Sequence, residues 1–508
     1  MKKIFTFIYT ICLCILITGC SSAGGISTFT VAVEKMPANF DPQIATDSAD
    51  ILVLTNVFDG LFEKLDGRIV NNLAEKCDIS PDGKTYDITI KQGSFYHYKG
   101  DTNRKEAFEG REVKAKDFVF AIERILDART HSPYYNDFSN IQSIVATGDY
   151  SLKIQLKTPD FNFTEKLAMT AAYPCCDEFF ATCGGAYGLS IENILSNGPF
   201  KLNYLDGENG NATIVSTRED DSNRLSRIRL VQMAADSQAK GYENDEISGF
   251  FAYSTQNAEY EDTAAMEFDS ANISLVYNLE KPMFQNENIR KALGWYAFGF
   301  ENSGANKNAV DRATSVFPGT VSLAGQYLHT LYQPDMPAYM AENPKQMLTD
   351  ALDAMGKPRM DACSILMPSD SIYTLIFENI NQLWQKNLGQ FFTIEYLPVS
   401  QIKQRIIKGD FDMAFLPVSP ENSTPYGILD NFAKYNSNVN SYVANAKNNT
   451  NQKNALADII SAADIVLEKA MIVPMGCEKT VFYYENYFYD IYIDPFTSII
   501  NLKYAAVL

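Results

Sequence analysis

The chain has 508 residues, which at roughly 100–200 residues per domain predicts about three domains. Its composition, 46% hydrophobic and 21% charged, is ordinary for a globular protein. The net charge of −19, without any basic block, makes nucleic acid and anionic membrane surfaces poor partners for the folded chain.

The first 20 residues predict export. Lys2 and Lys3 precede an apolar stretch from Ile4 to Ile17, too short for the roughly 20 residues of a membrane-spanning helix. This layout is that of a secretory signal peptide over residues 1–19. The sequence ITGC at its end resembles the bacterial lipobox, which implies that a lipid attached to Cys20 anchors the protein outside the cytoplasm. The alternative is plain secretion with an incidental Cys20.

Removal of the signal peptide would take away Lys2 and Lys3 and no acidic residue, changing the net charge from −19 to −21. The lipid, rather than the acidic body, would therefore hold the protein at the membrane. Residues 20–27 are mostly small and predict a flexible, lipidated tether. No later stretch is long and apolar enough to cross a membrane.

The first third of the chain predicts short strands, turns and helices in alternation. A β-branched strand is predicted at Thr28–Val33. Apolar positions at helical spacing predict helices over Ser48–Phe58 and Ala115–Leu126. Turn signals between short strands occur at Asp66-Gly67, Pro81-Asp82-Gly83 and Gly148-Asp149.

The alternation continues through the rest of the chain. A strand–turn–strand unit begins at Asn197, and Ile273–Lys281 predicts a strand before a helix capped by Asn286 or Asn288. The asparagine-rich run from Asn445 predicts a polar loop. Hairpins mixed with β–α alternation predict α/β domains with mixed sheets.

The stretch FDMAFLPVSPENSTPYGILDNF combines a strand with a loop. Phe411–Leu416, apolar except for Asp412, predicts a buried strand. A loop from Pro417 to Pro425 follows, in which Glu421 is the single charged residue. That carboxylate is either a solvated loop group or a binding group.

Common enzyme motifs are absent from the sequence: GxSxG, HExxH, the P-loop and a GxGxxG after a strand do not occur. His97, His131 and His329 are scattered without metal-ligand spacing. We therefore predict no catalytic activity, no metal and no cofactor. A glycosidase-like pair of carboxylates, and with it an exported hydrolase, stays open, although no pair stands out.

The cysteines beyond the tether leave two alternatives open. An exported location permits disulfides, but a large domain does not need them, so one disulfide and free thiols are both possible. Cys175, Cys176 and Cys183 lack the spacing of zinc ligands. The six cysteines are Cys77, Cys175, Cys176, Cys183, Cys363 and Cys477.

Four segments, in order, resemble the bacterial solute-binding proteins of family 5, the oligopeptide- and dipeptide-binding lipoproteins of ABC importers. FDPQ through KTYDITIKQG resembles the family signature, and EGREVKAKDFVFAIERIL, NGPFKL and ISLVYNLEKPMFQNENIRKALGWYAF resemble three later motifs. The match covers nearly the whole mature chain. The four segments are residues 40–93, 109–126, 197–202 and 273–298.

The resemblance implies a bilobal periplasmic-binding-protein-like fold of the class II type, with three domains and a hinge of two segments. Domain I would be discontinuous and comprise residues 28–64, 191–272 and 478–508. Domain II would be an insertion at residues 65–190. Domain III, the second lobe, would span residues 273–477, and ligand would be enclosed between the lobes.

The resemblance also points to ligand-binding residues. Family members fix a peptide ammonium with an aspartate in a segment similar to the loop after Asp412-Met413-Ala414, and Glu421 falls at that aspartate's position. Val418 replaces the family's tryptophan, beside Ser419, and Thr424 replaces its second aspartate. Weaker candidates, from loops that approach ligand in the family, are Asn39 in the loop from Met36 and Ser369 in the loop from Met367.

The implied function is capture of a peptide outside the cell and its delivery to a membrane permease driven by ATPase subunits. No covalent chemistry is needed, and a monomer is expected. Departures at the tryptophan and second aspartate leave a non-peptide solute, such as an oligosaccharide or a chelate, open as an alternative. A sensor or signalling lipoprotein with the same fold is a further alternative.

Overall fold

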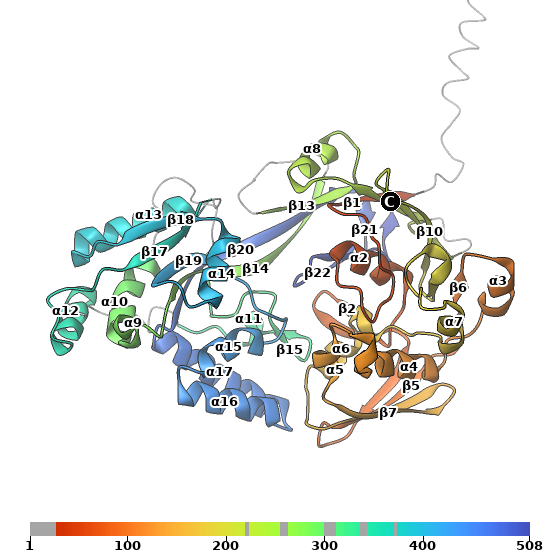
Figure 1. Cartoon of the computed structure of the whole chain (residues 1–508), viewed down its shortest axis with the longest axis horizontal. Coiled ribbons are helices and arrows are strands. Elements are labelled where there is room, and N and C mark those ends of the chain that lie inside the picture. The colour runs from red at the N-terminus through yellow and green to blue at the C-terminus, as the bar shows by residue number, and fades with distance from the viewer. Residues whose placement is uncertain (1–26, 219–222, 254–262, 299–310, 336–342, 370–372) are drawn as a thin grey trace, which may run out of the picture.

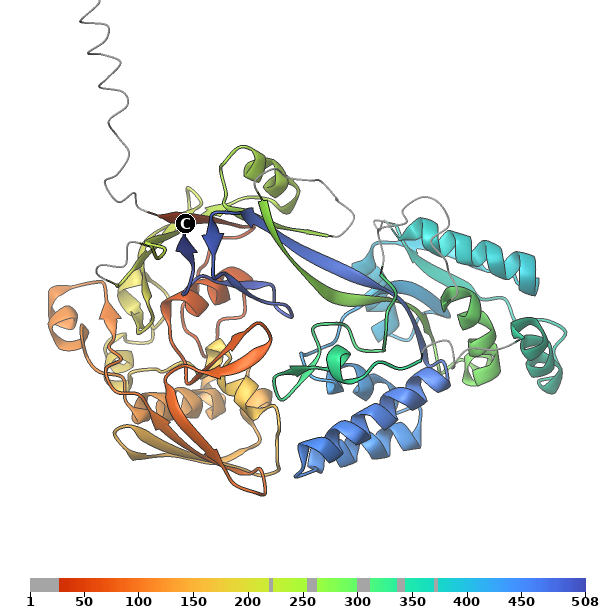
Figure 2. The ribbon, with the colours of Figure 1, turned by 180° about the vertical axis from the view of Figure 1, so that it is seen from behind.

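The computed structural model describes residues 27–218, 223–253, 263–298, 311–335, 343–369 and 373–508 (Figure 1). The signal peptide, Cys20 and nearly all of the tether lie outside these residues. The chain forms two lobes, and the views in Figures 1 and 2 both show two long strands running from one lobe to the other. These strands are β14 (Thr263–Tyr277) and β20 (Ile472–Glu485).

A ten-stranded mixed sheet extends through both lobes. β14 and β20 pair antiparallel, and at about 3.3 Å per residue the 15 residues of β14 reach roughly 50 Å. The bilobal α/β fold with a mixed sheet is therefore as predicted. The order is β10 (Phe200–Asp206), β11 (Asn211–Ser216), β12 (Arg227–Gln232), β1 (Thr28–Val33), β13 (Gly249–Tyr253), β20, β14, β19 (Met413–Val418), β17 (Ser364–Pro368) and β18 (Thr393–Leu397).

The pairing of β14 with β20 is interrupted twice. The register shifts between Asp269 and Ala271, and again between Ile273 and Ser274. Such irregularities bend a strand pair and loosen its ladder. Between the two shifts, Asn272 of β14 pairs directly with Cys477 of β20. The two strands that connect the lobes are therefore in register at this point.

The first lobe contains two large hydrophobic cores and a smaller cluster around Ile247, Phe250 and Ala252. One lies between the sheet and α2 (Ser48–Val57), which buries Leu52, Val53 and Leu54. The remaining elements of this part of the first lobe are α8 (Gln238–Glu243), β21 (Phe488–Tyr489), β22 (Tyr492–Asp494), β23 (Ile499–Asn501) and β24 (Ala506–Val507).

The second core belongs to the segment inserted between β1 and β10. The amphipathic helix α4 (Ala115–Leu126) packs its apolar side on a four-stranded sheet. The sheet order is β4 (Ala74–Ile79), β5 (Thr85–Ile90), β8 (Ser151–Leu156) and β7 (Ile141–Gly148). The other elements are β2 (Phe62–Leu65), β3 (Arg68–Asn71), β6 (His97–Tyr98), β9 (Leu195–Ser196), α3 (Thr102–Phe108), α5 (Tyr135–Phe138), α6 (Phe163–Leu167) and α7 (Asp177–Thr182).

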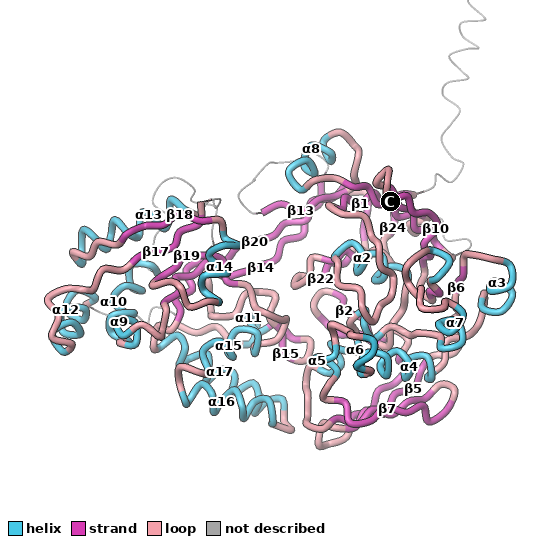
Figure 3. Tube along the Cα trace, viewed as in Figure 1, coloured by secondary structure: helices cyan, strands magenta, loops and turns pink. Residues whose placement is uncertain are grey.

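Helices cover the strands of the second lobe, as the cyan segments of Figure 3 show. β19 is buried on both faces: Phe415 stacks on Phe377 with ring centroids 4.5 Å apart, whereas Ala414 and Leu416 pack toward Ile402. Burial on both faces explains its unbroken apolar run. The elements are α9 (Pro282–Gln285), α10 (Glu287–Phe298), β15 (Ser322–Leu323), β16 (Gln326–Tyr327), α11 (Leu328–Leu331), α12 (Pro344–Ala354), α13 (Thr374–Leu383), α14 (Val399–Ile407), α15 (Tyr426–Ala433), α16 (Ser437–Asn448) and α17 (Gln452–Glu468).

Several predicted elements are confirmed, and two predictions are wrong. The run from Asn445 is not a loop, because α16 continues to Asn448 and Asn451 caps α17 by accepting a hydrogen bond from the Asn454 N–H. β19 does not end before Pro417, which pairs with Ile273 of β14. All six cysteines beyond the tether are free thiols. Among the described residues, no helix has the length and apolar character to span a membrane.

Candidate functional site

The loop after β19 holds three of the predicted ligand-binding residues. Val418 is half-buried, whereas Ser419 and Glu421 are exposed. The Glu421 N–H donates to the Gly427 carbonyl at 3.2 Å, but its carboxylate has no ion pair or hydrogen bond with any described residue. The loop backbone is therefore fixed, whereas the carboxylate is exposed.

The two remaining predicted residues lie on different lobes. Ser369 follows β17, which runs parallel to β19, so Ser369 lies at the same sheet edge as the Glu421 loop. Asn39 lies on the first lobe, where its side-chain oxygen accepts the Asp41 N–H at 3.0 Å. The structure thus gathers four of the five predicted residues at one edge, and gives Asn39 a local structural contact.

The loop of Asn39 is anchored by Asp50 of α2. Asp50 Oδ1 accepts the N–H groups of Ala38 at 2.7 Å and of Asn39 at 3.2 Å. Burial raises the pKa of Asp50, although both hydrogen bonds oppose that effect. Asp50 therefore holds the loop that follows β1 against the first lobe.

A second connection between the lobes lies away from the long strands. The hairpin β15–β16 reaches from the second lobe toward α6, as both ribbon views show (Figures 1 and 2). Asn162 Oδ1 accepts the Ala324 N–H at 2.7 Å, and Glu165 Oε1 accepts the Gly325 N–H at 2.8 Å and the Ser322 hydroxyl at 3.1 Å. We call these five residues the clasp.

Two residues of the clasp have a left-handed backbone conformation, which directs their N–H groups toward the first lobe. Ala324 and Gly325 have φ of +50° and +75°, and their successive N–H groups both serve Asn162 and Glu165. The loop that contains Glu421 also contacts the clasp, because the Ser423 hydroxyl lies 3.5 Å from Glu165 Oε2.

Tyr327, the last residue of the hairpin β15–β16, packs on the turn between β2 and β3. A Cβ on Gly67 would lie 2.0 Å from the Tyr327 hydroxyl oxygen, and Gly67 has a φ of +71°. Only glycine satisfies both constraints at this position. The Tyr327 ring of the second lobe therefore packs directly against the first lobe.

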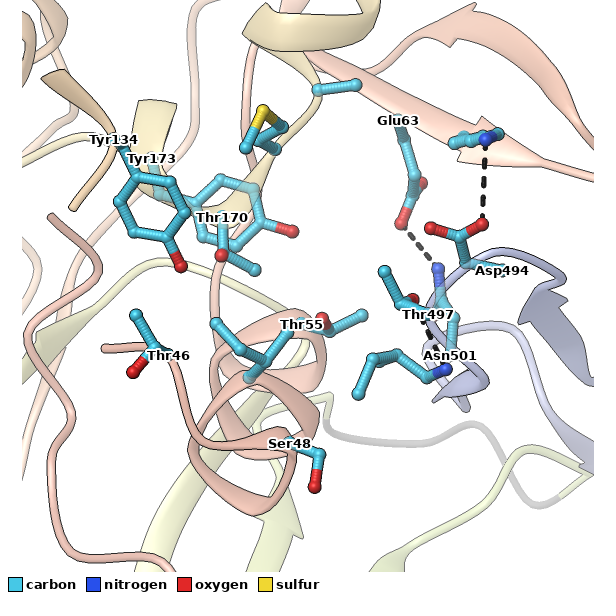
Figure 4. A pocket seen from close by; sticks show the side chains of 15 residues that line it. Thr46, Ser48, Thr55, Glu63, Tyr134, Thr170, Tyr173, Asp494, Thr497 and Asn501 are labelled. Carbon is cyan, nitrogen blue, oxygen red and sulfur yellow. Dashed lines mark hydrogen bonds and ion pairs between the residues drawn. The ribbon is translucent and has the colours of Figure 1, made fainter. Parts of the chain in front are cut away.

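A cavity of about 350 Å³ opens in the first lobe (Figure 4). It is formed by α2, the end of β2, the segment after α6 and the turn between β22 and β23. Thr46, Ser48 and Thr497 are exposed and form its rim, whereas Glu63 and Tyr173 are buried at its base. Its volume lies at the lower end of the range for ligand pockets, about 300–1,000 Å³.

A buried charge network supports the base of the cavity. Glu63 accepts hydrogen bonds from Asn501 at 2.7 Å, from Lys503 at 3.0 Å and from the Tyr504 hydroxyl at 2.6 Å. Burial alone would lower the pKa of Lys503, but the carboxylates of Asp59 and Glu63 outweigh it and raise that pKa well above its usual range. Lys503 therefore stays charged and pairs with both Asp59 and Glu63, each at 3.0 Å.

The cavity borders the second lobe. Lys64 of β2 lines it and pairs with Asp494 at 3.5 Å, and the turn that follows β2 contains Gly67, on which Tyr327 of the second lobe packs. The cavity therefore lies on the side of the first lobe that meets the clasp.

The family model for bacterial extracellular solute-binding proteins, family 5 (middle region), matches residues 68–440. The chain belongs to this family. The family 5 protein is 23% identical to the oligopeptide-binding protein OppA of Bacillus subtilis over 73% of this chain and 71% of that one. It is 22% identical to the dipeptide-binding protein DppE of Bacillus subtilis over 90% of this chain and 87% of that one.

Solved structures share the fold of this family 5 protein. The periplasmic murein tripeptide-binding protein MppA, in an unliganded open form, superimposes with a TM-score of 0.75 and 18% identity over 95% of this chain and 98% of that one. OppA of Listeria monocytogenes, bound to peptide, superimposes with a TM-score of 0.62 and 20% identity over 95% and 99%.

One cluster in the family 5 protein resembles a metal site in composition. Cys176 and the carboxylates of Asp117 and Glu178 offer ligand atoms that lie within 4.8 Å of one another, together with Asp177. Arg111 already pairs with Asp117 and Glu178. Burial raises the pKa of the Cys176 thiol to about 12, which disfavours the thiolate that binds metals. The cluster is an ion-pair network.

Sequence reasoning missed the clasp and the cavity. The acceptors Asn162 and Glu165 bind mostly backbone N–H groups, which leave no residue-type signal in the sequence. Glu63 and Lys503 are 440 residues apart, so no local pattern connects them.

Proposed function

We propose that the protein captures a peptide between its two lobes and delivers it to the permease and ATPase subunits of an ABC importer. The observation that carries this proposal is the family membership, together with an oligopeptide-binding and a dipeptide-binding relative that are matched over 71% and 87% of their lengths. The protein would act by binding alone, without covalent chemistry.

Closure about the long strands would trap the ligand. β14 and β20 are the chain crossings, and their two register shifts are the natural places for bending. A ligand that touches both lobes stabilises the closed state by its contacts in that state. In this scheme residues 28–64, 191–272 and 478–508 form domain I, residues 65–190 domain II and residues 273–477 domain III.

Glu421 would bind the peptide ammonium. Its carboxylate is exposed at the edge shared with Ser369 and has no partner among the described residues. A charge-assisted hydrogen bond is roughly twice as strong as a neutral one, so this contact would orient the peptide by its N-terminus. Val418 and Ser419 would flank the bound end.

The protein would work at the outer face of the cell membrane as a monomer, tethered by a lipid on Cys20. Mass spectrometry of the mature N-terminal peptide would detect the lipid. Replacement of Cys20 by alanine should release the protein from the membrane fraction, and retention of that variant would contradict the anchor.

Native mass spectrometry of freshly purified protein tests the function directly. Co-purified peptides, displaced by added peptide in calorimetry, are the expected result. Binding of oligosaccharides or chelates with no binding of any peptide would overturn the peptide assignment. Hydrolysis of bound peptides, followed by liquid chromatography, would overturn the view that the protein acts by binding alone.

A further inference from the structure

The charged groups on the cavity wall are already matched. Glu63 receives three hydrogen bonds, from Asn501, Lys503 and Tyr504, and Lys64 lies 3.5 Å from the carboxylate of Asp494. Figure 4 shows the hydrogen bond between Glu63 and Asn501 and the ion pair of Asp494 along one side of the cavity. The wall therefore offers no spare charge to an incoming ligand group.

The rest of the wall is apolar or carries neutral hydroxyls. Ile51, Met169 and Ile499 contribute aliphatic and thioether surface, and the rings of Tyr134 and Tyr173 lie on the opposite side from Glu63 (Figure 4). Hydroxyls donate or accept hydrogen bonds without charge. A charged group placed here would lose water and find no counter-charge, whereas an uncharged group would gain contacts.

The size of the cavity sets a second limit. About 350 Å³ is the lower end of the range for small-molecule sites, so the cavity holds one side chain rather than a whole oligopeptide. Tyr327 of the second lobe packs on Gly67, three residues beyond the cavity-lining Lys64, which places the cavity beside the second lobe.

We propose that this cavity takes one uncharged, mainly apolar side chain of the bound peptide and rejects lysine, arginine, aspartate and glutamate at that position. The inference rests on the proposed function, since it concerns the same ligand. Each charged group on the wall already has a partner, so a charged side chain of the ligand would enter the cavity without a counter-charge.

Calorimetry with the intact protein and a family of tetrapeptides tests the proposal. Each position in turn carries leucine, tyrosine, lysine or glutamate. At one position, lysine and glutamate should each weaken binding at least tenfold relative to leucine or tyrosine. Equal affinity for all four residues at every position would overturn the proposal. A wild-type protein that binds no tetrapeptide at all would instead show that the proposed function itself is wrong.

Two variants locate the selection in the cavity. Ala168→Phe should fill the cavity and weaken binding of the tyrosine peptide at least tenfold. A further peptide that carries glycine at that position should bind as it does to the wild type. Thr46→Trp, at the exposed rim, serves the same purpose if Ala168→Phe does not fold. Tyrosine affinity unchanged in a folded filling variant would overturn the proposal.

A negative charge added at the rim of the cavity should change which peptide side chain the cavity prefers. Ser48→Asp should bring the affinity for the lysine peptide at least fivefold closer to that for the leucine peptide. Ser437→Asp is the matched control, because Ser48 and Ser437 are both exposed first residues of helices, α2 and α16. The same gain in both variants would contradict a role for the cavity.

Discussion

The carboxylate of Glu165 accepts a hydrogen bond from the Gly325 N–H at 2.8 Å, although the two residues are 160 positions apart and lie on different lobes. With Asn162 and Ala324 it forms a second link between lobes that are otherwise joined by β14 and β20. The clasp, in which Asn162 and Ser322 are buried and Glu165 is half-buried, is the weaker of the two links and limits how far the lobes open.

Removal of the clasp should let the ligand-free lobes separate further. Asn162→Ala with Glu165→Ala takes away the acceptors of three hydrogen bonds, together about 1–3 kcal/mol after discounting for exposure. Small-angle X-ray scattering should show a larger radius of gyration. Glu106→Ala, an exposed glutamate of α3, is the control. An unchanged radius in the double variant would show that the clasp does not limit opening.

Lys503→Met should destabilise the first lobe strongly. Lys503 is 1% exposed and its Nζ lies 3.0 Å from both Asp59 and Glu63, so its loss leaves the buried Glu63 and the half-buried Asp59 without their cation. Removal of one partner of a buried pair costs about 3–5 kcal/mol. Urea unfolding measures this cost, with exposed Lys240→Met as control. A loss below 1 kcal/mol would mean that water or rearrangement compensates the carboxylates.

Glu421→Gln should weaken binding of peptides with a free N-terminus about tenfold, equivalent to roughly 1.4 kcal/mol. N-acetylated peptides should bind wild type and variant equally, because they carry no ammonium. Glu468→Gln, another exposed carboxylate of the second lobe, should change neither affinity. If free and acetylated peptides respond alike to Glu421→Gln, the carboxylate does not bind the ammonium.

Asp269 at the hinge should make stability depend on pH. Burial raises its pKa, while Lys479 opposes the shift. A raised folded pKa means that the folded state binds the proton more readily than the unfolded state, whose pKa is about 3.9. Its contribution to the unfolding free energy therefore falls as pH rises from about 4 through the raised pKa.

Asp269→Asn removes this titration, so its stability relative to wild type should be greater at pH 7.5 than at pH 4.5. Urea unfolding at the two pH values measures the difference, and exposed Asp353→Asn should show no such change. A relative stability that is constant or moves in the opposite direction would contradict the raised pKa.

Local patterns predicted local structure well. Thr28–Val33 and Ala115–Leu126 form the strand and helix expected, because β-branched composition and amphipathic spacing are properties of a short segment. The run from Asn445 was misjudged because its asparagines act as helix ends and a cap rather than as a loop. Polar composition alone does not separate these two uses.

The site was less predictable than the fold. Resemblance to a family directed attention to the Glu421 loop, but the contacts around Glu165 depend on which segments tertiary packing brings together. The length of β14 was also missed, because the predicted strand Ile273–Lys281 covers only its C-terminal end. Long-range pairing carries no signature within one segment.

The order of the strands has a consequence for how the protein folds. The second lobe is built from one continuous length of chain between β14 and β20, whereas Phe29 of β1 packs against Phe488, near the opposite end, with ring centroids 4.8 Å apart. Contacts between distant parts of a chain form slowly, since a large loop must close first. During synthesis and export the first lobe must wait for the last residues to emerge. We therefore expect amides of the second lobe to gain protection earlier in refolding, as pulse-labelling hydrogen exchange would reveal.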